Sequence, residues 1–177
     1  MSKGWYAKLR KKDPLTQGEM IFDFPILQWN SDQSSRSSSL IFKTADEFKG
    51  DQRKLLQTLN IVNTDVIIMS QSCDLEHKKL RNVVLCPHWS IDTYKSAWEL
   101  DRRNKNQNPT SKAWNNFLGD LCDGYIWNLT ILGKNSLSNP EMTQRVVDFH
   151  EIYTVPIEFI LKFVQKPKIK RFYLLPP

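Results

Sequence analysis

The chain lacks the features that would place it in a membrane or an oxidising compartment. No apolar run approaches the roughly 18 residues that a transmembrane helix needs. The first five residues do not contain the apolar stretch of a signal peptide. With only three cysteines among 177 residues, no disulfide framework is indicated. We therefore expect a cytoplasmic protein with reduced thiols.

Several catalytic motifs are also missing. The sequence has no GxxxxGK[ST], GxGxxG or HExxH pattern, which argues against nucleotide-driven chemistry and zinc-protease chemistry. No internal repeat is present. The length and a composition of 40% hydrophobic and 25% charged residues are typical of one globular domain, which we expect to span residues 1–177. Because the chain stops abruptly at an apolar segment, residues 174–177, we expect that it is truncated there.

Acidic residues are absent from both ends of the chain. Residues 1–12, a basic arm, contain five Lys or Arg, and residues 162–171 contain five more. The body, residues 13–161, has 15 basic and 19 acidic residues, so its net charge is −4 although the whole chain carries +6. Basic ends can bind phosphate backbones without sequence preference, and the alternative is that they only aid solubility. The predicted nucleic-acid-binding residues are Lys8, Arg10, Lys11, Lys12, Lys168, Lys170 and Arg171.

Apolar periodicity predicts a mixture of strands and helices. The expected strands are residues 18–27, 66–69, 82–86 (ended by Pro87), 125–132, 145–154 and 169–175. The expected helices are residues 44–59, 90–106, 111–122 and 156–164. Residues 30–39 form a Ser-rich segment that we expect to be a mobile loop, and residues 70–74 a polar loop. This pattern indicates an α+β fold, with a small, strongly bent barrel-like sheet and helical insertions at 44–59, 90–106 and 111–122.

Two cysteines and two histidines fall within 16 residues. Cys73, His77, Cys86 and His88 have the spacing C-x3-H-x8-C-x-H. Zn²⁺ favours four such sulfur and nitrogen ligands, and positions 86 and 88 share one face of a strand. We predict a structural zinc site made of these four residues. The alternative is that Cys86 is a small core residue and His77 a solvated loop residue.

The same loop contains the acid–base and nucleophilic candidates. Cys73 could be a nucleophile if His77 or the Lys78-Lys79 pair favoured its thiolate. Asp74, His77 and His88 are the acid–base candidates that flank the two core strands, and a histidine can move protons near neutral pH. In the alternative, Asp74 caps a turn and Cys73 packs. No Gly-rich oxyanion loop accompanies them.

Three segments resemble a known family. Gly18-Glu19-Met20-Ile21-Phe22, then Val66-Ile67-Ile68-Met69-Ser70, then Val83-Val84-Leu85-Cys86-Pro87 resemble the barrel strands of the MazF/PemK (Kid) toxin superfamily. The resemblance covers about half of the chain and implies a small SH3-like β-barrel, often dimeric, found in endoribonucleases and their relatives. The family has its catalytic Arg where this chain has Thr64-Asp65, and its catalytic Thr where this chain has His88-Trp89-Ser90. Ser70-Gln71-Ser72-Cys73-Asp74-Leu75 also resembles a signature of bacterial proteins without an assigned activity.

Three classes of function follow. The first is a bacterial or phage-encoded, non-catalytic module that binds nucleic acid or belongs to a defence or toxin–antitoxin system. The second is a metal-stabilised interaction subunit of a larger complex, and the third is a ribonuclease-like hydrolase. Because the family's arginine and threonine are not at the matching positions, we expect no RNA cleavage. The expected partner is nucleic acid or another protein subunit, with a homodimer as one assembly.

Overall fold

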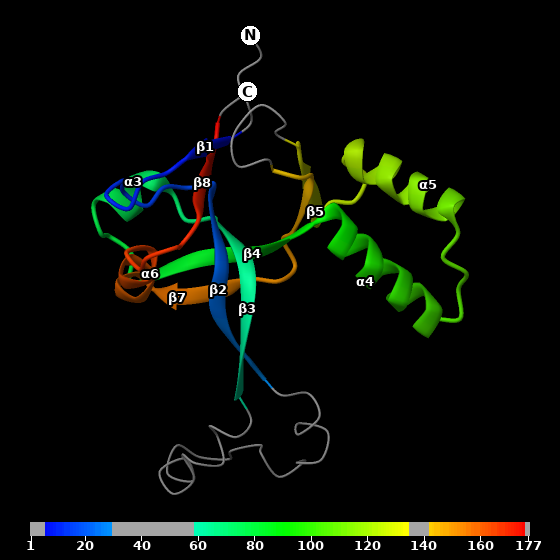
Figure 1. The fold of residues 1–177 in the computed structure, drawn as a ribbon, viewed down its shortest axis with the longest axis horizontal. Coiled ribbons are helices and arrows are strands. Elements are labelled where there is room, and N and C mark those ends of the chain that lie inside the picture. The colour runs from blue at the N-terminus through cyan, green and yellow to red at the C-terminus, as the bar shows by residue number, and fades with distance from the viewer. Residues whose placement is uncertain (1–5, 30–58, 135–141, 176–177) are drawn as a thin grey trace, which may run out of the picture. The chain divides into compact units, whose positions relative to one another are not determined.

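The computed structural model describes residues 6–29, 59–134 and 142–175 (Figure 1). Two compact units divide the chain: unit 1 comprises Met1–Asp23 with Asp65–Pro177, and unit 2 comprises Phe24–Thr64. The elements are β1 (Tyr6–Lys8), β2 (Glu19–Trp29), β3 (Leu59–Ile68), α3 (Ser72–Glu76), β4 (Asn82–Ser90), α4 (Ile91–Asn104), α5 (Ser111–Cys122), β5 (Leu129–Leu132), β6 (Arg145–Asp148), β7 (Tyr153–Pro156), α6 (Ile157–Val164) and β8 (Arg171–Leu174).

These strands form one eight-stranded sheet, and the α+β class indicated by the sequence is confirmed. The strand order is β1-β8-β2-β3-β4-β6-β5, and β7 also pairs with β4. Every pair of strands whose register is known is antiparallel. Among the described residues, the hydrogen-bonded order does not close into a ring, because β1 stands at one end and β5 at the other.

Strand β4 changes partners along one of its edges. Its first half pairs with β7 up to Leu85↔Tyr153, and its second half pairs with β6 from His88↔Val147. Two residues separate these positions on β4 and five separate them on the other side, so residues 148–152 form a large bulge. The expected strand 145–154 is therefore two strands, β6 and β7.

The prediction that Pro87 ends its strand is wrong. Pro87 pairs with Val66 of β3, and β4 continues to Ser90. Val84 directs its backbone toward β3, where its carbonyl accepts a hydrogen bond from Met69 N at 2.9 Å. Alternation along the strand then directs the Pro87 nitrogen toward β6 and β7, at the bulge, where no ladder hydrogen bond is lost.

Other boundaries also differ from the expectations. The predicted loop 30–39 and helix 44–59 lie outside the described residues, except for Leu59, which begins β3. The predicted polar loop 70–74 contains the start of α3. The predicted strand 125–132 begins only at Leu129, because hydrogen bonds from Tyr125 N to Asp120 O and from Leu129 N to Ile126 O turn the preceding backbone. Helices α4, α5 and α6 confirm the other three predicted helices.

The main core of unit 1 lies against one face of the sheet. Its buried members come from seven strands and from the segment before β6: Tyr6, Met20, Ile67, Cys86, Leu132, Met142, Val147 and Phe172. Tyr6 of β1 also donates a hydrogen bond of 2.7 Å to the carbonyl of Gly133, directly after β5. Burial raises the pKa of the Tyr6 hydroxyl to about 12, partly offset by the charge of Arg145. A hydrogen bond thus joins β1, at one end of the strand order, to the residue that follows β5, at the other end.

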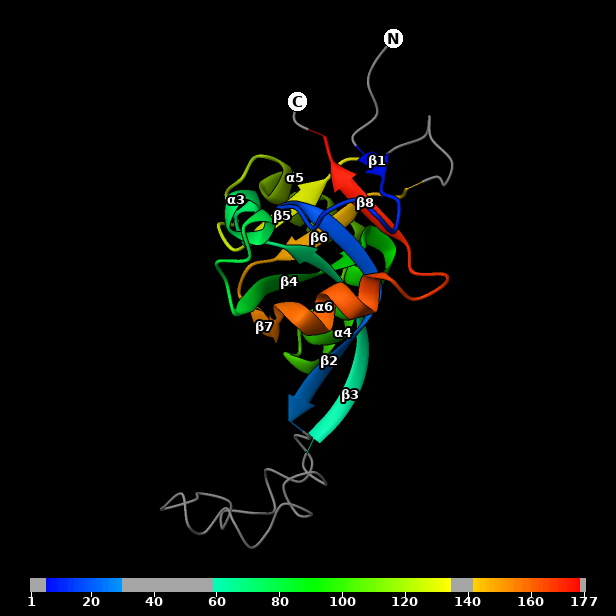
Figure 2. The ribbon, with the colours of Figure 1, turned by 90° about the vertical axis from the view of Figure 1, so that its left-hand side faces the viewer.

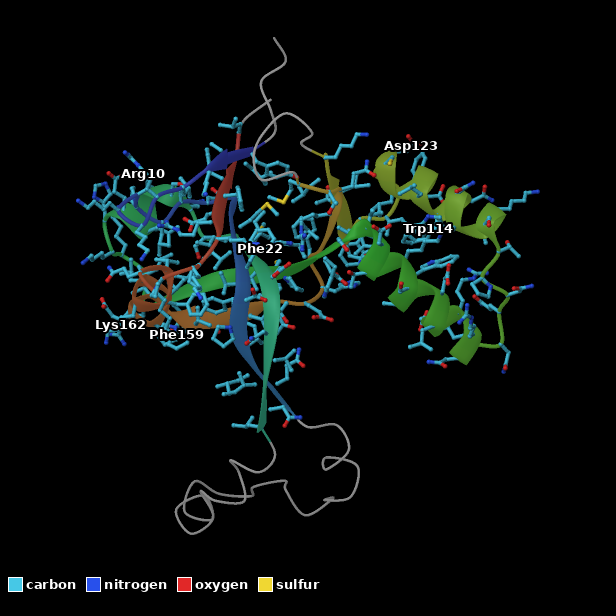
Figure 3. The ribbon with its side chains drawn as sticks, in the orientation of Figure 1. Arg10, Phe22, Trp114, Asp123, Phe159 and Lys162 are labelled. Carbon is cyan, nitrogen blue, oxygen red and sulfur yellow. The ribbon has the colours of Figure 1, made fainter. Side chains whose placement is uncertain are left out.

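Helices α4 and α5 form an antiparallel hairpin beside the sheet (Figure 1). Ser90 and Thr110 cap them by accepting hydrogen bonds from Thr93 N and Ala113 N. Aromatic rings lie between the helices: Trp114, labelled in Figure 3, stacks on Phe117 with centroids 5.5 Å apart and meets Trp98 edge-on at 5.2 Å. The hairpin therefore has an aromatic core of its own.

Candidate functional site

The structure brings the two basic ends of the chain together. Strand β1 pairs with β8 in the register Lys8↔Phe172, and Leu9 N donates to Arg171 O at 3.0 Å (Figure 2). The segment that follows β1 therefore runs beside the segment that precedes β8. Six of the seven predicted nucleic-acid-binding residues are exposed there: Lys8, Arg10, Lys11, Lys12, Lys168 and Lys170. We call these six residues the basic face.

The prediction for Arg171 is corrected by its burial. Only 2% of Arg171 is exposed, and its guanidinium makes a bidentate contact with the fully buried Glu19, with Nε to Oε1 at 2.5 Å and Nη2 to Oε2 at 3.0 Å. Burial raises the pKa of Glu19, and the ion pair with Arg171 opposes that shift. Arg171 is therefore not available to a phosphate.

The remaining donors of Arg171 hold the loop of the basic face. Nη1 donates to the carbonyl of Arg10 at 2.9 Å, and Nη2 donates to the carbonyl of Asp13 at 3.2 Å. Arg171 thus holds the backbone of this loop, while the side chains of Arg10, Lys11 and Lys12 are exposed to solvent. Figure 3 labels Arg10 at the outer edge of the molecule. Asp13 forms an ion pair with Arg10 at 3.1 Å, and hydrogen bonds from Arg10 lower the pKa of Asp13.

The four predicted zinc ligands have different surroundings. Cys73 is exposed in α3, and His77 is exposed at its C-terminal end. Cys86 is buried in the core of unit 1, where burial raises the pKa of its thiol, and His88 is fully buried on the same face of β4. No group of three or more His, Cys, Asp or Glu side chains suited to a metal ion occurs in the described ranges. Zinc binding stays a prediction that elemental analysis tests.

The predicted catalytic residues are likewise divided between α3 and β4. Cys73 Sγ lies 3.8 Å from both Gln71 Oε1 and Asp74 Oδ1, which are oxygen acceptors. His88 is buried in β4, where it accepts a hydrogen bond from Arg145.

A buried polar cluster that the sequence did not indicate lies on one face of the sheet. Arg145 Nε donates to His88 Nδ1 at 2.6 Å, and Arg145 Nη2 donates to Asp65 Oδ2 at 2.5 Å. The guanidinium also lies 5.0 Å from the ring centroid of Phe22, a cation–π contact. Phe22 meets the His88 ring edge-on at 5.4 Å. Four strands thus each contribute one member: β2, β3, β4 and β6.

Register explains why these side chains meet. His88 pairs with Val147, so Arg145, two residues before Val147, projects from the same face of the sheet. On the other side of β4, Val66 pairs with Pro87, which places Asp65 opposite His88. Residues 65 and 145 are 80 positions apart in the chain, so no local spacing could have indicated this cluster.

The surroundings hold His88 neutral. Burial, followed by the charge of Arg145, lowers the pKa of His88 well below its ordinary value, while the backbone of Val66 acts in the opposite direction. Because Nδ1 accepts from Arg145, the proton of the neutral ring is on Nε2, which is buried without a hydrogen-bond partner in the described part of the chain. Burial also lowers the pKa of Arg145, and Asp65 opposes that shift.

This cluster is closed to a large substrate. His88 has no exposed surface and Arg145 is 8% exposed, so the members that reach solvent are the half-buried Asp65 and Phe22. The guanidinium already donates to a carboxylate and to an imidazole. The arrangement therefore neutralises a buried arginine and joins β3, β4 and β6.

No family model, curated protein or solved structure matches this chain.

Proposed function

We propose that this protein is a non-catalytic nucleic-acid-binding module that contacts the phosphate backbone through the basic face. The observation that carries the proposal is the β1·β8 pairing, which joins two basic segments from opposite ends of the sequence. Six exposed cationic side chains gathered on one unit can displace the counterions of a nucleic acid, which is the main source of affinity without sequence preference. The buried Glu19–Arg171 pair supports this role by fixing the loop that presents three of them.

The absence of catalysis is part of the proposal. Where the MazF/PemK superfamily has its catalytic Arg and Thr, this chain has Thr64-Asp65 and His88-Trp89-Ser90, and of these residues Asp65 and His88 accept hydrogen bonds from Arg145. An arginine that stabilises a cleaved phosphate needs free donors directed at the developing charge. Arg145 is buried and already paired. We infer a relative of defence or toxin–antitoxin barrels that does not cut RNA.

We also infer that the sheet is of the small, strongly bent SH3-like type. The three segments that resemble the superfamily fall in β2, β3 and β4, which are consecutive neighbours in the sheet. The bulge opposite Pro87 and the Tyr6–Gly133 hydrogen bond support strong bending. An experimental structure of the chain tests this inference: a flat sheet, in which Tyr6 and Gly133 lie far apart, would contradict it.

Binding of a fluorescent random 20-mer of RNA or DNA tests the function. A variant with Lys11→Gln, Lys12→Gln and Lys170→Gln removes charges from both basic ends, and we expect its affinity to fall at least about tenfold near 100 mM salt. The matched control is Arg103→Gln, Lys105→Gln and Lys112→Gln, three exposed cations of the α4–α5 hairpin, which should bind as the unmodified protein does. Equal losses in both variants would show that overall charge, and not the basic face, causes the binding.

A further inference from the structure

A second exposed surface of unit 1 is aromatic. It is formed by the turn between α5 and β5 and by the bulge between β6 and β7. Tyr125 is 78% exposed, Trp127 79% and Ile152 60%. We call Tyr125, Trp127, His150 and Ile152 the aromatic surface. Large apolar side chains gathered at this exposure are typical of interaction sites.

The aromatic surface is held in place by a hydrogen-bonded frame. Asp148 Oδ1 accepts from His150 N at 2.8 Å and from Asn128 Nδ2 at 3.5 Å, so one carboxylate joins the bulge to the turn. Phe149 N donates to Asn128 O at 2.8 Å. The Trp127 ring then meets the His150 ring edge-on, with centroids 4.7 Å apart. The backbone that carries Trp127 and His150 is therefore held before a partner arrives, which reduces the entropy lost on binding.

The two segments that carry these side chains contain acidic residues and no basic ones. Residues 113–133 and 146–161, which contain the turn and the bulge, include five acidic residues and no Lys or Arg. Asp123 is exposed at the end of α5, where Figure 3 labels it, and Glu151 is exposed beside His150, with its Oε2 accepting from the Tyr153 hydroxyl at 2.8 Å. This charge is opposite to that of the basic face.

We propose that the aromatic surface docks a segment of a partner protein that carries Lys or Arg beside apolar residues. A cation is attracted both by the carboxylates and by the π-face of tryptophan, which is the best cation–π acceptor among the side chains. The apolar residues cover Ile152 and the rings. Exposed aromatics also stack nucleic-acid bases, but a strand bound here would bring its phosphates beside Asp123 and Glu151, so the charges favour the cationic protein segment.

Three labelled 12-residue peptides test the proposal by fluorescence anisotropy. The first combines Arg and Leu with Gly spacers, the second has Glu in place of Arg, and the third has Ser in place of Leu. We expect the first to bind the full chain at least tenfold more tightly than the other two. Trp127→Ala should weaken that binding at least tenfold, and Asp123→Asn with Glu151→Gln should weaken it and reduce its dependence on salt. Leu100→Ser, an exposed apolar position of α4, is the matched control.

Four results would overturn the proposal. They are failure of the first peptide to bind, equal binding of the acidic peptide, unchanged binding in Trp127→Ala, and the same loss in Leu100→Ser. An oligonucleotide whose binding is lost in Trp127→Ala would assign the surface to nucleic acid instead. Self-association lost in the same variant would assign it to a second copy of the chain. Because Trp127 is largely exposed, its replacement should leave the melting temperature unchanged, which separates lost docking from unfolding.

Discussion

At the scale of single residues, the neutral His88 links stability to pH. The pKa of His88 in the folded protein lies well below its ordinary value, whereas in the unfolded chain the ring takes up a proton near pH 6.5. The unfolded state therefore binds more protons than the folded state as the pH falls below about 6.5. The free energy of unfolding should decrease by up to about 1.4 kcal/mol per pH unit until the folded pKa is reached.

Urea unfolding at several pH values between 7.5 and 5 measures this slope. His88→Gln keeps an acceptor for Arg145 Nε but cannot titrate, so its slope should be smaller by up to one proton. Leu100→Ser, a substitution at an exposed position of α4 that removes no titrating group, is the control and should keep the slope of the unmodified protein. If His88→Gln and the unmodified protein show identical slopes, His88 is not a buried neutral acceptor.

The ion pair between Glu19 and Arg171 gives a second prediction at this scale. Glu19→Gln would leave a buried guanidinium without its carboxylate, and breaking one partner of such a pair costs about 3–5 kcal/mol. We expect the unfolding free energy to fall by this amount.

Because Arg171 also holds the loop at Arg10, oligonucleotide binding of the remaining folded protein should weaken as well. Asp13→Asn, which removes an exposed ion pair of the same loop, should change stability much less. A Glu19→Gln protein as stable as the unmodified one would show that the Glu19–Arg171 ion pair does not stabilise the fold.

At the scale of elements, the α4–α5 hairpin depends on its aromatic core. Trp114 is buried between the helices and contacts both Trp98 and Phe117. Trp114→Ala should cost about 3–5 kcal/mol within the hairpin. Hydrogen exchange should then accelerate in α4 and α5 while β3 and β4 keep their protection. Leu100→Ala, exposed on α4, should leave all four elements unchanged. Equal acceleration in the sheet would mean that the hairpin and the sheet unfold together.

Local patterns were sufficient for some elements and not for others. The caps at Ser90 and Thr110 and the apolar spacing of α4 and α5 are local features, so the sequence indicated both helices. The path of β4 through Pro87 could not be read locally, because it depends on a bulge about 60 residues further along the chain. The expected start of a strand at 125 failed because two backbone turns precede Leu129.

The candidate sites show the same limit. Exposed lysines and arginines could be identified as basic from the sequence, but their meeting depends on the β1·β8 pairing between opposite ends of the chain. Arg171, in the same pair of strands, is buried, and the sequence alone could not distinguish it from its exposed basic neighbours. Arg145 was not indicated for a site at all, since its contacts with Asp65 and His88 arise from strand register. Charge pattern was readable, and the contacts of individual side chains were not.

At the scale of the whole molecule, the proposed function depends on charges contributed by both ends of the sequence. A binding surface made of two distant segments requires the folded state. After unfolding by heat or urea, substitutions in the basic face should therefore weaken oligonucleotide binding no more than substitutions of the α4–α5 cations do. None of the described helices is both long and apolar enough to cross a membrane.

The salt dependence of oligonucleotide binding tests the central claim most directly. The logarithm of the association constant should fall linearly with the logarithm of the salt concentration, and each charge lost from the basic face should reduce the slope by about 0.7 to 0.9. The variant with Lys11→Gln, Lys12→Gln and Lys170→Gln should have a slope smaller by about two to three. The control variant with Arg103→Gln, Lys105→Gln and Lys112→Gln should keep the slope of the unmodified protein. A slope near zero in the unmodified protein, or an equal slope in the basic-face variant, would contradict the central claim.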